Sequence, residues 1–429
     1  MPSTALLTDQ YELTMVSASL RDGTADRPCV FEVFGRRLPN NRRYGVVAGT
    51  GRLVEAIRDF RFDPDDVAFL RERGVVDAEM ADWLARYRFT GDIEGYAEGE
   101  LYFPGSPILT VVAPFAVGVL LETLALSVLN HDCAIATAAA RMVTAARGRP
   151  IIEMGSRRTH ERSAVAAARA AYLAGFASTS NVEAGRRYDI PTAGTAAHAF
   201  TLLHDSEAEA FASQIAAVGK DTTLLVDTYD ITQGIRTAIE VAGPELGAIR
   251  IDSGDLSVMA VQARELLDSL GARDTRIVVS GDLDEHSIAA LAAAPVDAYG
   301  AGTAVVTGAG APTAQLVYKL VEVDGRAVVK RSENKRTVGG RKYAVRRHKP
   351  TGTATEEVVA SQCRPAEEPH DRPLQRSYLV GGEVVADLPD LAASRRHLAE
   401  CLVSIPWDGL KLSAGDPVVP VVMLGPTEH

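Results

Sequence analysis

The sequence predicts an α/β protein built on an irregular (β/α) barrel, with an α/β domain formed by the N-terminal region and the C-terminal tail. Between residues 150 and 310, short apolar runs alternate with amphipathic helical patterns, which is typical of a parallel sheet. The unit recurs often enough to favour a closed barrel over an open sheet. Polar residues directly follow the apolar runs, at the position where barrel enzymes carry their chemistry.

The first region, residues 1–113, predicts a mixed α/β domain, because short helical patterns are interleaved with apolar alternation. We expect helices over Leu6–Met15, Gly51–Phe60, Asp65–Glu72 and Ala78–Arg86, and strands at Cys29–Phe34 and around Gly95, Leu101 and Ile108.

The second region, residues 114–342, should contain the barrel and the active site. The Ala- and Leu-rich stretch from Pro114 to Arg147 predicts two helices with a break near Asn130 to Asp132. Strands should begin near Pro150, Phe176, Thr222, Gly247, Arg276 and Val296, with helices over Ser163–Ala174, Ile231–Ala242, Leu256–Leu270 and Asp284–Ala293.

The last region, residues 343–429, is rich in Pro, Glu and Arg and too short to form an independent core, so we expect it to pack on the N-terminal domain. The segment YLVGGEVV, Tyr378 to Val385, predicts a hairpin with a Gly-Gly turn. A final helix should run from about Asp390 to Leu402.

Composition limits the possible partners and the compartment. The formal net charge of -11 argues against broad, nonspecific nucleic-acid binding.

The four cysteines are far apart and lack zinc-site spacing, so we expect free thiols in a reducing cytoplasm. We expect no signal peptide, and no membrane span, because the most apolar run, Val111 to Leu121, contains Pro114 and is too short.

The stretch AIRIDSGD, Ala248 to Asp255, changes from a buried apolar run into a cluster of charge. In an extended strand, Ile249 and Ile251 would face one side, and Arg250 and Asp252 the other. We therefore expect a packed face and a functional face, followed by a turn into a helix.

The loops after the other strands should bring further polar residues to the same rim. They carry Met154–Arg158, Ser178–Asn181, Gly194–His198, Asp227–Asp230, Ser280–Asp282 and Gly300–Thr303. The turn at Gly300–Thr303 comes late in the barrel and has the flexibility and backbone N–H groups that suit a phosphate.

Several carboxylates at one rim suit Mg²⁺, the hydroxyls of a sugar, or a transition state with positive charge on a sugar ring. Helix capping is the alternative, since Asp230, Asp255 and Asp282 each stand where a helix N-cap is expected. Asp227 and Asp252 precede their loops, so capping does not account for them, and function is favoured for both.

Four further side chains need to be weighed against ordinary structural explanations. His198 lies in a segment of small apolar residues, where most single histidines are structural. Arg157 and Arg158 follow a predicted buried strand, and a pair of arginines there suits a carboxylate or phosphate better than a plain surface. Tyr11 is by default a packed aromatic residue.

Taken together, the ordered motifs make the chain resemble the nicotinate phosphoribosyltransferase family. They are TDQYELTM, FEVFGRRLP with YGVVAG, EMGSRR, STSNV, GTAAHAF, VDTYD, RIDSGD, SGDLDE, YGAGT and YKLVE, and they extend from about Leu6 to about Leu412. The resemblance implies an enzyme of NAD salvage that joins nicotinate and 5-phosphoribosyl 1-pyrophosphate. The products would be nicotinate mononucleotide and pyrophosphate, with ATP hydrolysis as a coupled, ligase-type step.

The resemblance also implies roles for residues around the base. His198 matches the histidine that ATP phosphorylates. Asp9 and Tyr11 match a segment that reaches the active site of the neighbouring subunit, which requires a homodimer with shared sites. Arg157 matches the arginine that lines the base site. Ser180, with Asn181, stands where the nicotinamide enzymes carry Asp, and so implies the acid rather than the amide.

For the phosphoribosyl group, the resemblance implies a second set of residues. Asp252 and Asp227 would be catalytic and would hold Mg²⁺, with Asp227 on the pyrophosphate side. Binding of the sugar and its phosphate would fall to Arg250, Ser253, Asp255, Gly281, Asp282, Gly300, Gly302 and Thr303.

Two departures from the family pattern are visible. The phosphate turn reads GAGT rather than GVGT, a small change that keeps the backbone donors. Some members carry a cysteine cluster that binds zinc, but Cys363 and Cys401 stand alone here, so we expect no structural zinc.

The alternatives are a nicotinamide or quinolinate phosphoribosyltransferase, a metal-dependent barrel aldolase or isomerase, and a regulator that binds nucleotide without turnover. Quinolinate would need more basic residues than the pair at Arg157. An aldolase or isomerase would have no reason to use ATP, and a regulator would be expected to lack His198.

Overall fold

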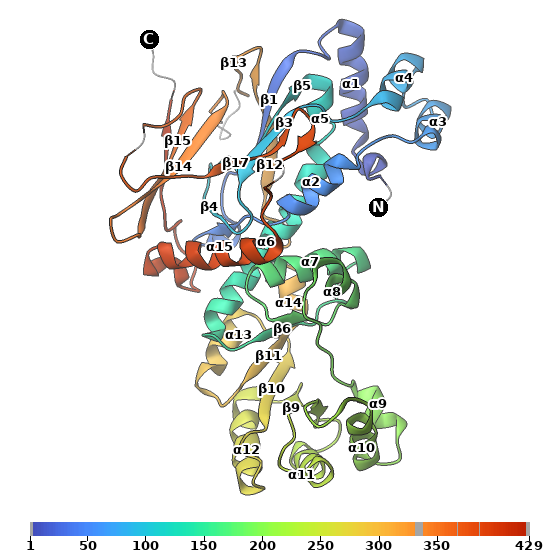
Figure 1. Cartoon of the computed structure of the whole chain (residues 1–429), viewed down its shortest axis with the longest axis vertical. Helices are drawn as coiled ribbons and strands as arrows, with labels where there is room; N and C mark the ends of the chain where they lie inside the picture. The colour runs from blue at the N-terminus through green and yellow to red at the C-terminus, as the bar shows by residue number, and fades with distance from the viewer. Residues whose placement is uncertain (1–2, 331–337, 367, 386, 426–429) are drawn as a thin grey trace. The chain divides into compact units, whose positions relative to one another are not determined.

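The computed structural model describes residues 3–330, 338–366, 368–385 and 387–425 (Figure 1). The chain folds into two compact units, Met1–Ala134 with Thr313–His429, and Ile135–Pro312. These bounds differ from the expected ranges 1–113, 114–342 and 343–429, because residues 114–134 and the described residues 313–330 and 338–342 group with the first unit. The reason is strand pairing, since β12 (Leu316–Val323) lies antiparallel to β1 (Pro28–Gly35).

The first unit is built on a seven-stranded sheet in the order β13-β12-β1-β5-β3-β17-β18, in which each strand lies antiparallel to its neighbours. Three separate parts of the sequence supply it. The remaining strands are β3 (Asp92–Tyr96), β5 (Leu109–Pro114), β13 (Arg326–Ala327), β17 (Gln375–Val380) and β18 (Glu383–Val384), and a small pair is formed by β2 (Gly45–Val46) and β4 (Leu101–Tyr102). The predicted hairpin is confirmed, with Gly381 and Gly382 between β17 and β18.

The helices of this unit largely match the prediction. They are η1 (Ala5–Leu7), α1 (Gln10–Asp22), η2 (Pro39–Asn41), α2 (Thr50–Arg58), α3 (Pro64–Glu72), α4 (Ala78–Arg86), α5 (Phe115–Val119), α15 (Leu391–Ser404) and η4 (Trp407–Leu410). The first helix extends beyond the predicted Met15 and ends at Gly23, which adopts the left-handed conformation that favours glycine (φ 77°).

The expected break near Asn130 to Asp132 is wrong, because α6 runs without interruption over Glu122–Ala146. The polar side chains there have tertiary partners and do not end the helix. The Asn130 Oδ1 atom accepts from the Leu316 N–H at 2.8 Å, and the Asp132 carboxylate accepts from Arg52 Nε at 2.9 Å. Burial acts to raise the pKa of Asp132, but Arg52 and His131 outweigh it and lower the pKa to about 2.

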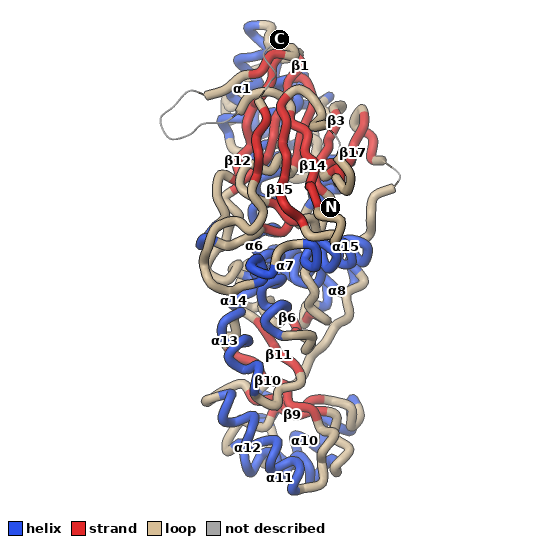
Figure 2. Tube along the Cα trace, turned by 90° about the vertical axis from the view of Figure 1, so that its left-hand side faces the viewer, coloured by secondary structure: helices blue, strands red, loops and turns tan. Residues whose placement is uncertain are grey.

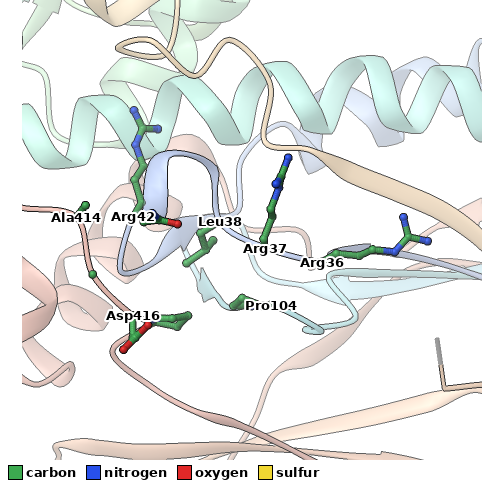
Figure 3. Close-up of a pocket in the computed structure, with 10 residues that line it drawn as sticks. Arg36, Arg37, Leu38, Arg42, Pro104, Ala414 and Asp416 are labelled. Atoms are coloured by element: carbon green, nitrogen blue, oxygen red, sulfur yellow. The ribbon is translucent and has the colours of Figure 1, made fainter. Parts of the chain in front are cut away.

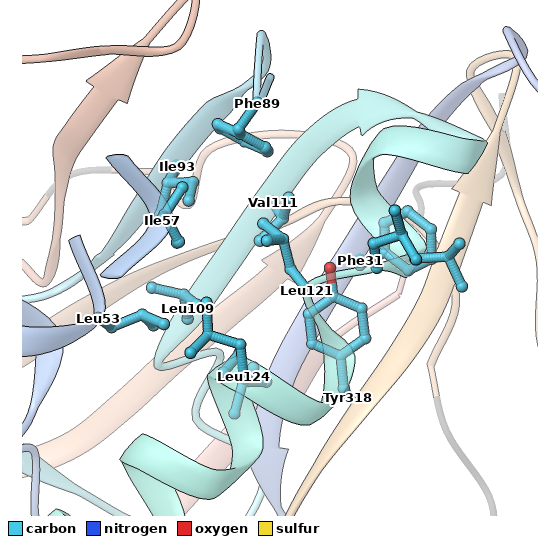
Figure 4. Close-up of a cluster of buried hydrophobic side chains, with 14 of the residues drawn as sticks. Phe31, Leu53, Ile57, Phe89, Ile93, Leu109, Val111, Leu121, Leu124 and Tyr318 are labelled. Atoms are coloured by element: carbon cyan, nitrogen blue, oxygen red, sulfur yellow. The ribbon is translucent and has the colours of Figure 1, made fainter. Parts of the chain in front are cut away.

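The core of the first unit is a cluster of buried apolar side chains between its sheet and its helices (Figure 4). The Phe31 ring stacks on Tyr318 with centroids 5.2 Å apart, and the Tyr318 hydroxyl donates to the Gly118 carbonyl at 2.7 Å. Within the described residues, one helix, Phe115–Ala146, is long and apolar enough to cross a membrane. Its most apolar window is 67% buried inside the protein, which is typical of a core helix.

The tail adds a four-stranded sheet that the sequence patterns did not predict, in the order β16-β14-β15-β19. Its strands are β14 (Lys342–His348), β15 (Ala354–Ser361), β16 (Arg372–Pro373) and β19 (Val421–Leu424). A buried ion network links this sheet to residues near β4: Arg346 donates to Glu100 at 2.8 Å and to Glu357 at 2.5 Å.

The second unit contains a six-stranded parallel sheet in the order β7-β6-β11-β10-β9-β8 (Figure 2). The strands are β6 (Ile151–Glu153), β7 (Ser178–Thr179), β8 (Thr223–Leu225), β9 (Ala248–Ile251), β10 (Arg276–Gly281) and β11 (Ala298–Ala301). The helices are α7 (Glu161–Leu173), α8 (Val182–Tyr188), α9 (His198–Leu203), α10 (Glu207–Val218), α11 (Ile231–Ala242), α12 (Leu256–Ser269), α13 (Glu285–Ala290), η3 (Leu291–Ala293) and α14 (Thr303–Val306).

This strand order is that of a barrel with one open seam. The last strand, β11, pairs with the first, β6, so the sheet curls round on itself. Among the described residues β7 and β8 do not pair, and the chain between them, residues 180–222, carries α8, α9 and α10. The predicted irregular barrel is therefore confirmed, with closure incomplete at this one position.

Parallel pairing brings the carboxyl ends of these strands to one edge of the sheet. Ser280 lies opposite Gly300, Ala301 opposite Glu153, and Glu153 opposite Thr179. The residues that follow each strand consequently lie along a common rim.

Candidate active site

Arg250 is the centre of the hydrogen-bond network at the rim. Its Nε donates to Ser280 Oγ at 2.6 Å, its Nη1 to Thr195 Oγ1 at 3.0 Å, and its Nη2 to Asp252 Oδ1 at 2.7 Å. The predicted alternation in β9 explains this, because Ile249 and Ile251 are fully buried while Arg250 faces the other side. One guanidinium therefore links two neighbouring strands to the segment before α9.

Asp252 is held in its charged form by this network. Its Oδ1 atom accepts from Arg250 and from the Ser280 hydroxyl. Burial acts to raise the pKa of Asp252, but the hydrogen bonds from Ser280 and Arg250 outweigh burial and keep the pKa below its usual range. An ionised carboxylate at this position can stabilise positive charge on a bound ligand.

Asp227 follows β8 and is almost completely buried, with its side chain 1% exposed. Its Oδ2 atom accepts from the Asp252 N–H at 2.8 Å and from the Ser253 hydroxyl at 2.7 Å. Its Oδ1 atom is also buried, and it has no hydrogen-bond donor among the described residues. A buried carboxylate oxygen is normally paired, and the nearest basic group to this atom is the His198 ring, whose Nε2 lies 3.9 Å away.

His198 is the first residue of α9, in the segment between β7 and β8. Its Nδ1 atom lies 3.1 Å from Thr228 Oγ1, and its Nε2 atom lies 3.9 Å from Asp227 Oδ1. The side chain is 41% exposed, so the ring is both oriented and open to a ligand. The ring thus has two neighbours from the loop after β8, which the sequence alone did not identify.

The loops after β6 and β7 form another part of the rim. The buried Glu153 accepts from Thr179 Oγ1 at 2.5 Å and from the Gly155 N–H, and burial raises the pKa of Glu153 despite these bonds. Asn181 donates to Ser156 Oγ at 3.0 Å and also caps α8. Beside them, Arg157 and Ser180 are exposed.

The glycine-rich turn after β11 packs closely against the loop after β6. A Cβ atom on Gly300 would lie 2.8 Å from Met154 Sδ, and one on Gly155 would lie 2.2 Å from a methyl group of Val306. These positions accept only glycine without rearrangement. Gly302 and the exposed Thr303 follow and begin α14.

The capping alternative holds for two of the candidate aspartates. Asp230 accepts from the Gln233 N–H at 2.8 Å as the cap of α11, and Asp255 accepts from the first turn of α12. Asp282 is exposed and caps no helix, since Asp284 caps α13. Capping therefore accounts for Asp230 and Asp255, but not for Asp227, Asp252 or Asp282.

Asp9 and Tyr11 belong to the first unit and are not among the residues that the second unit brings together. Asp9 is the N-cap residue of α1, without a side-chain capping bond, and Tyr11 is 46% exposed. Partial burial, followed by nearby Glu122, raises the pKa of Tyr11 to about 12. The phenol is thus neutral at physiological pH.

The sequence placed Ser280, Thr195 and Thr228 in the rim loops but assigned them no role. In the structure, Ser280 and Thr195 accept hydrogen bonds from Arg250, and Thr228 lies beside His198. Glu207, the first residue of α10, was missed entirely, because Ser206 followed by acidic residues is an ordinary helix start. Burial, then the negative charges of Asp227 and Asp230, raise the pKa of Glu207 to about 6.

A separate cavity of about 430 Å³ lies in the first unit (Figure 3). Arg36, Arg37 and Arg42 line it together with Asp416. None of the rim residues of the second unit contributes to its lining.

Two places offer metal-binding atoms. At the rim, the Oδ1 atom of Asp227 accepts no hydrogen bond from the described residues and is the kind of hard oxygen ligand that Mg²⁺ prefers, so the site fits the ion that the resemblance implies. In the first unit, Glu100, His397 and Cys401 lie together, but Arg346 and Arg372 already pair with the Glu100 carboxylate. We assign no metal to this second cluster, because an ion would have to displace guanidinium groups.

Family models match both parts of the chain. The N-terminal domain of nicotinate phosphoribosyltransferase matches residues 6–130, and the C-terminal domain of quinolinate phosphoribosyl transferase matches residues 135–310. The boundary between the two matches agrees with the division of the structure after Ala134.

Individual relatives agree with these matches. A nicotinate phosphoribosyltransferase of Mycobacterium tuberculosis is 62% identical over 425 residues, covering 97% of this chain and 94% of that protein. One from Bacillus subtilis is 40% identical over 360 residues, covering 80% of this chain and 73% of that protein. Among solved structures, human nicotinic acid phosphoribosyltransferase aligns with a TM-score of 0.86 at 27% identity, covering 97% of each chain. The nearly complete coverage and high identity show that this chain belongs to the nicotinate phosphoribosyltransferase family.

Proposed function

We propose that this protein joins nicotinate and 5-phosphoribosyl 1-pyrophosphate to give nicotinate mononucleotide and pyrophosphate, as a step of NAD salvage. The observation that carries the proposal is the connected network in the second unit. It runs from Arg250 and Asp252 through Asp227 to the ring of His198, which lies 3.9 Å from Asp227. Sugar chemistry and phosphoryl transfer can therefore take place at adjoining positions.

In the synthetic step, the chain mainly positions its substrates and stabilises charge. The new C–N bond forms as the bond from the sugar carbon to pyrophosphate breaks, through a state with positive charge on the sugar. Asp252, ionised and half-buried, is placed to stabilise that charge, and Arg250 to hold the phosphoribosyl group. The nicotinate ring nitrogen attacks with its own lone pair, so no general base is needed.

Several groups complete the proposed sugar site. Ser253 orients Asp227 through its hydroxyl group, while Gly281 and Asp282 would contact the ribose hydroxyls. Gly302 and Thr303 would bind the 5-phosphate, with Gly300 required for the close packing of that turn. Asp255 is assigned to capping α12 and would contribute only indirectly.

For ATP coupling, we propose that His198 accepts the γ-phosphoryl group. An N–P bond forms at the ring as the bond from the γ-phosphorus to ADP breaks, and hydrolysis later returns the free imidazole and phosphate. With Nδ1 donating to Thr228, Nε2 retains the lone pair that attacks. Mg²⁺, held by Asp227 and Asp252, would spread the charge on the transferring group.

The base site and the assembly are proposed from the resemblance. Arg157 would pair with the nicotinate carboxylate, and the uncharged Ser180 and Asn181 favour an acid over an amide. Asp9 and Tyr11 would complete the site of a neighbouring subunit in a homodimer. The four described cysteines are all free thiols, which supports the proposed cytoplasmic location.

A quinolinate phosphoribosyltransferase is the second candidate, because a family model with that description matches the barrel region. Quinolinate has two carboxylates, whereas Arg157 and Arg158 are the only arginines in the loop after β6. Turnover of nicotinate, nicotinamide and quinolinate should be compared in one assay, and nicotinate should react fastest.

The deciding experiment is mass spectrometry after treatment with ATP. Wild type should carry one acid-labile phosphate on His198, while His198→Ala should carry none and should lose ATP stimulation but keep slow product formation. His204→Ala is the matched control, since His204 ends the same helix and bonds only the Phe200 carbonyl in the described structure. Phosphate on the His198→Ala protein would refute the assignment.

A further inference from the structure

Glu153 is a buried carboxylate at the rim to which the proposed reaction gives no role. It is the last residue of β6 and is 1% exposed. Its Oε2 atom accepts from the Thr179 hydroxyl at 2.5 Å, and its Oε1 atom accepts from the Gly155 N–H at 2.5 Å. Both of these donors are neutral, so the two contacts are hydrogen bonds and not ion pairs.

The two donors belong to the two loops that carry the candidate base-site residues. Gly155 lies two residues before Arg157 in the loop after β6. Thr179 ends β7 and directly precedes Ser180. Glu153 lies opposite Thr179 in the parallel pair of strands, and its carbonyl oxygen accepts from the Ser180 N–H at 2.8 Å. A single residue therefore holds the loops from which the exposed Arg157 and Ser180 extend.

Thr179 extends this connection to Asn181. The Thr179 hydroxyl oxygen accepts from the Asn181 N–H at 3.0 Å while the hydroxyl group donates to Glu153. The Asn181 side chain in turn donates to Ser156 Oγ at 3.0 Å. The loops after β6 and β7 are thus joined at two points, through Glu153 and through Ser156.

The loop after β6 is also confined on the side of the glycine-rich turn. The Met154 N–H donates to the Ala301 carbonyl at 2.7 Å. A Cβ atom on Gly155 would lie 2.9 Å from Glu153 Oε1 and 3.0 Å from the Gly302 carbonyl oxygen. Gly155 therefore lies between the Glu153 carboxylate and the turn after β11, and a displacement of Gly155 would also move Arg157.

We propose that Glu153 is a positioning residue for the base, which fixes Arg157 and Ser180 relative to each other and so sets the preference for an acid over an amide. The inference rests on the proposed function, because it requires that these two side chains meet nicotinate. Glu153 is buried beneath the two loops and acts through its hydrogen bonds. Such positioning matters because a misplacement of about 1 Å can cost about 100-fold in rate.

The test is steady-state kinetics of Glu153→Ala and Glu153→Gln, with nicotinamide as a competitive inhibitor so that its affinity is measured whether or not it reacts. Glu153→Ala removes both acceptors and should raise the KM for nicotinate by about 10- to 100-fold. The KM for 5-phosphoribosyl 1-pyrophosphate should change little, because the network around Arg250 is intact. The ratio of the Ki for nicotinamide to the KM for nicotinate should fall by about 10-fold or more.

Glu153→Gln separates hydrogen bonding from charge. The glutamine carbonyl can accept from the Gly155 N–H, and its amide group can donate to the Thr179 hydroxyl oxygen. Both loops then stay connected without a negative charge. Glu153→Gln should therefore recover most of the wild-type KM for nicotinate and most of the wild-type ratio.

Glu285→Ala is the matched control for the loss of a buried carboxylate. Glu285 is 4% exposed and lies in the same unit, and its carboxylate accepts from Arg141 Nε on α6 at 2.9 Å. This variant should lower the midpoint of thermal unfolding but keep the wild-type ratio of Ki to KM. If Glu153→Ala does not fold, Thr179→Val takes its place and should lower the ratio, whereas Thr179→Ser, which keeps the hydroxyl group, should not.

Three results would overturn the inference. The first is a ratio of Ki to KM in Glu153→Ala, or in Thr179→Val, that equals that of wild type. The second is an equal rise in the KM values for both substrates, or a fall of the ratio in Glu285→Ala, since either would indicate general damage. The third is a loss in Glu153→Gln as large as that in Glu153→Ala, which would show that the charge and not the hydrogen bonding is required.

Failure of the proposed function would look different. If wild type does not convert nicotinate and 5-phosphoribosyl 1-pyrophosphate, the proposed function fails and this inference fails with it. If wild type does convert them and the Glu153 variants retain its ratio, the proposed function stands and only the inference fails.

Discussion

Replacing Arg250 by Lys should lower kcat/KM for 5-phosphoribosyl 1-pyrophosphate while leaving the protein folded. Arg250 reaches three acceptors at once, Ser280 Oγ at 2.6 Å, Thr195 Oγ1 at 3.0 Å and Asp252 Oδ1 at 2.7 Å. A lysine has one nitrogen and a shorter reach, so at least one of these bonds must be lost. Losing one hydrogen bond to a charged group costs about 1.5–3 kcal/mol, which corresponds to about a 10- to 100-fold loss of rate.

The assay is initial-rate kinetics at 25 °C with nicotinate saturating, together with circular dichroism to confirm folding. Arg276→Lys is a suitable control, because Arg276 begins the neighbouring strand β10, is exposed, and contacts only the Gly247 carbonyl at 3.3 Å in the described structure. Unchanged kcat/KM in Arg250→Lys would refute the argument that this network places the sugar. A similar loss in Arg276→Lys would show that the effect is not specific to the rim.

Four further outcomes follow from the same geometry. Arg157→Ala should raise the KM for nicotinate by about 10-fold or more, the cost of one bond to a charged group, and an unchanged KM would place the carboxylate elsewhere. Ser180→Asp should shift the ratio of kcat/KM values towards nicotinamide, because a carboxylate repels the acid; a ratio that stays the same argues against a contact with the base. Mixing Tyr11→Ala with His198→Ala protein should restore part of the activity if each site uses two subunits, whereas a self-contained site gives no rescue. Asp132→Asn should lower the free energy of unfolding at pH 7 by about 2–3 kcal/mol, since a pKa depressed to about 2 stabilises the fold above about pH 4. Urea titrations of both proteins should show this difference in unfolding free energy shrinking as the pH falls towards 2. A difference that does not change with pH would contradict the ion pair.

The barrel region could be predicted well because its signals are local. Buried parallel strands are short continuous apolar runs, and β9 and β10 begin within a residue of the positions expected. Parallel pairing then places whatever follows each strand on one rim, so Asp227, Asp252 and Ser280 could be grouped before any contact was known.

The misplaced helix break shows where local signals fail. Asn130 and Asp132 are weak helix formers, and on propensity alone a break at this point was reasonable. In the structure their side chains are satisfied by distant partners, Leu316 and Arg52, and the helix continues. The same limit hid β12, whose place in the first sheet depends on pairing with β1.

By itself, the sequence determined the α/β class, the alternation of strands and helices along the chain, the family, and the residue types available at the rim. Those properties depend on periodicity and on short motifs, which are carried by neighbours along the chain. Only the tertiary structure decided that the barrel stays open between β7 and β8, and that Thr228 and Asp227 flank His198. It alone also revealed a buried oxygen of Asp227 that accepts no hydrogen bond from the described residues, because the burial and pairing of an atom depend on residues that are remote in sequence and brought together by folding.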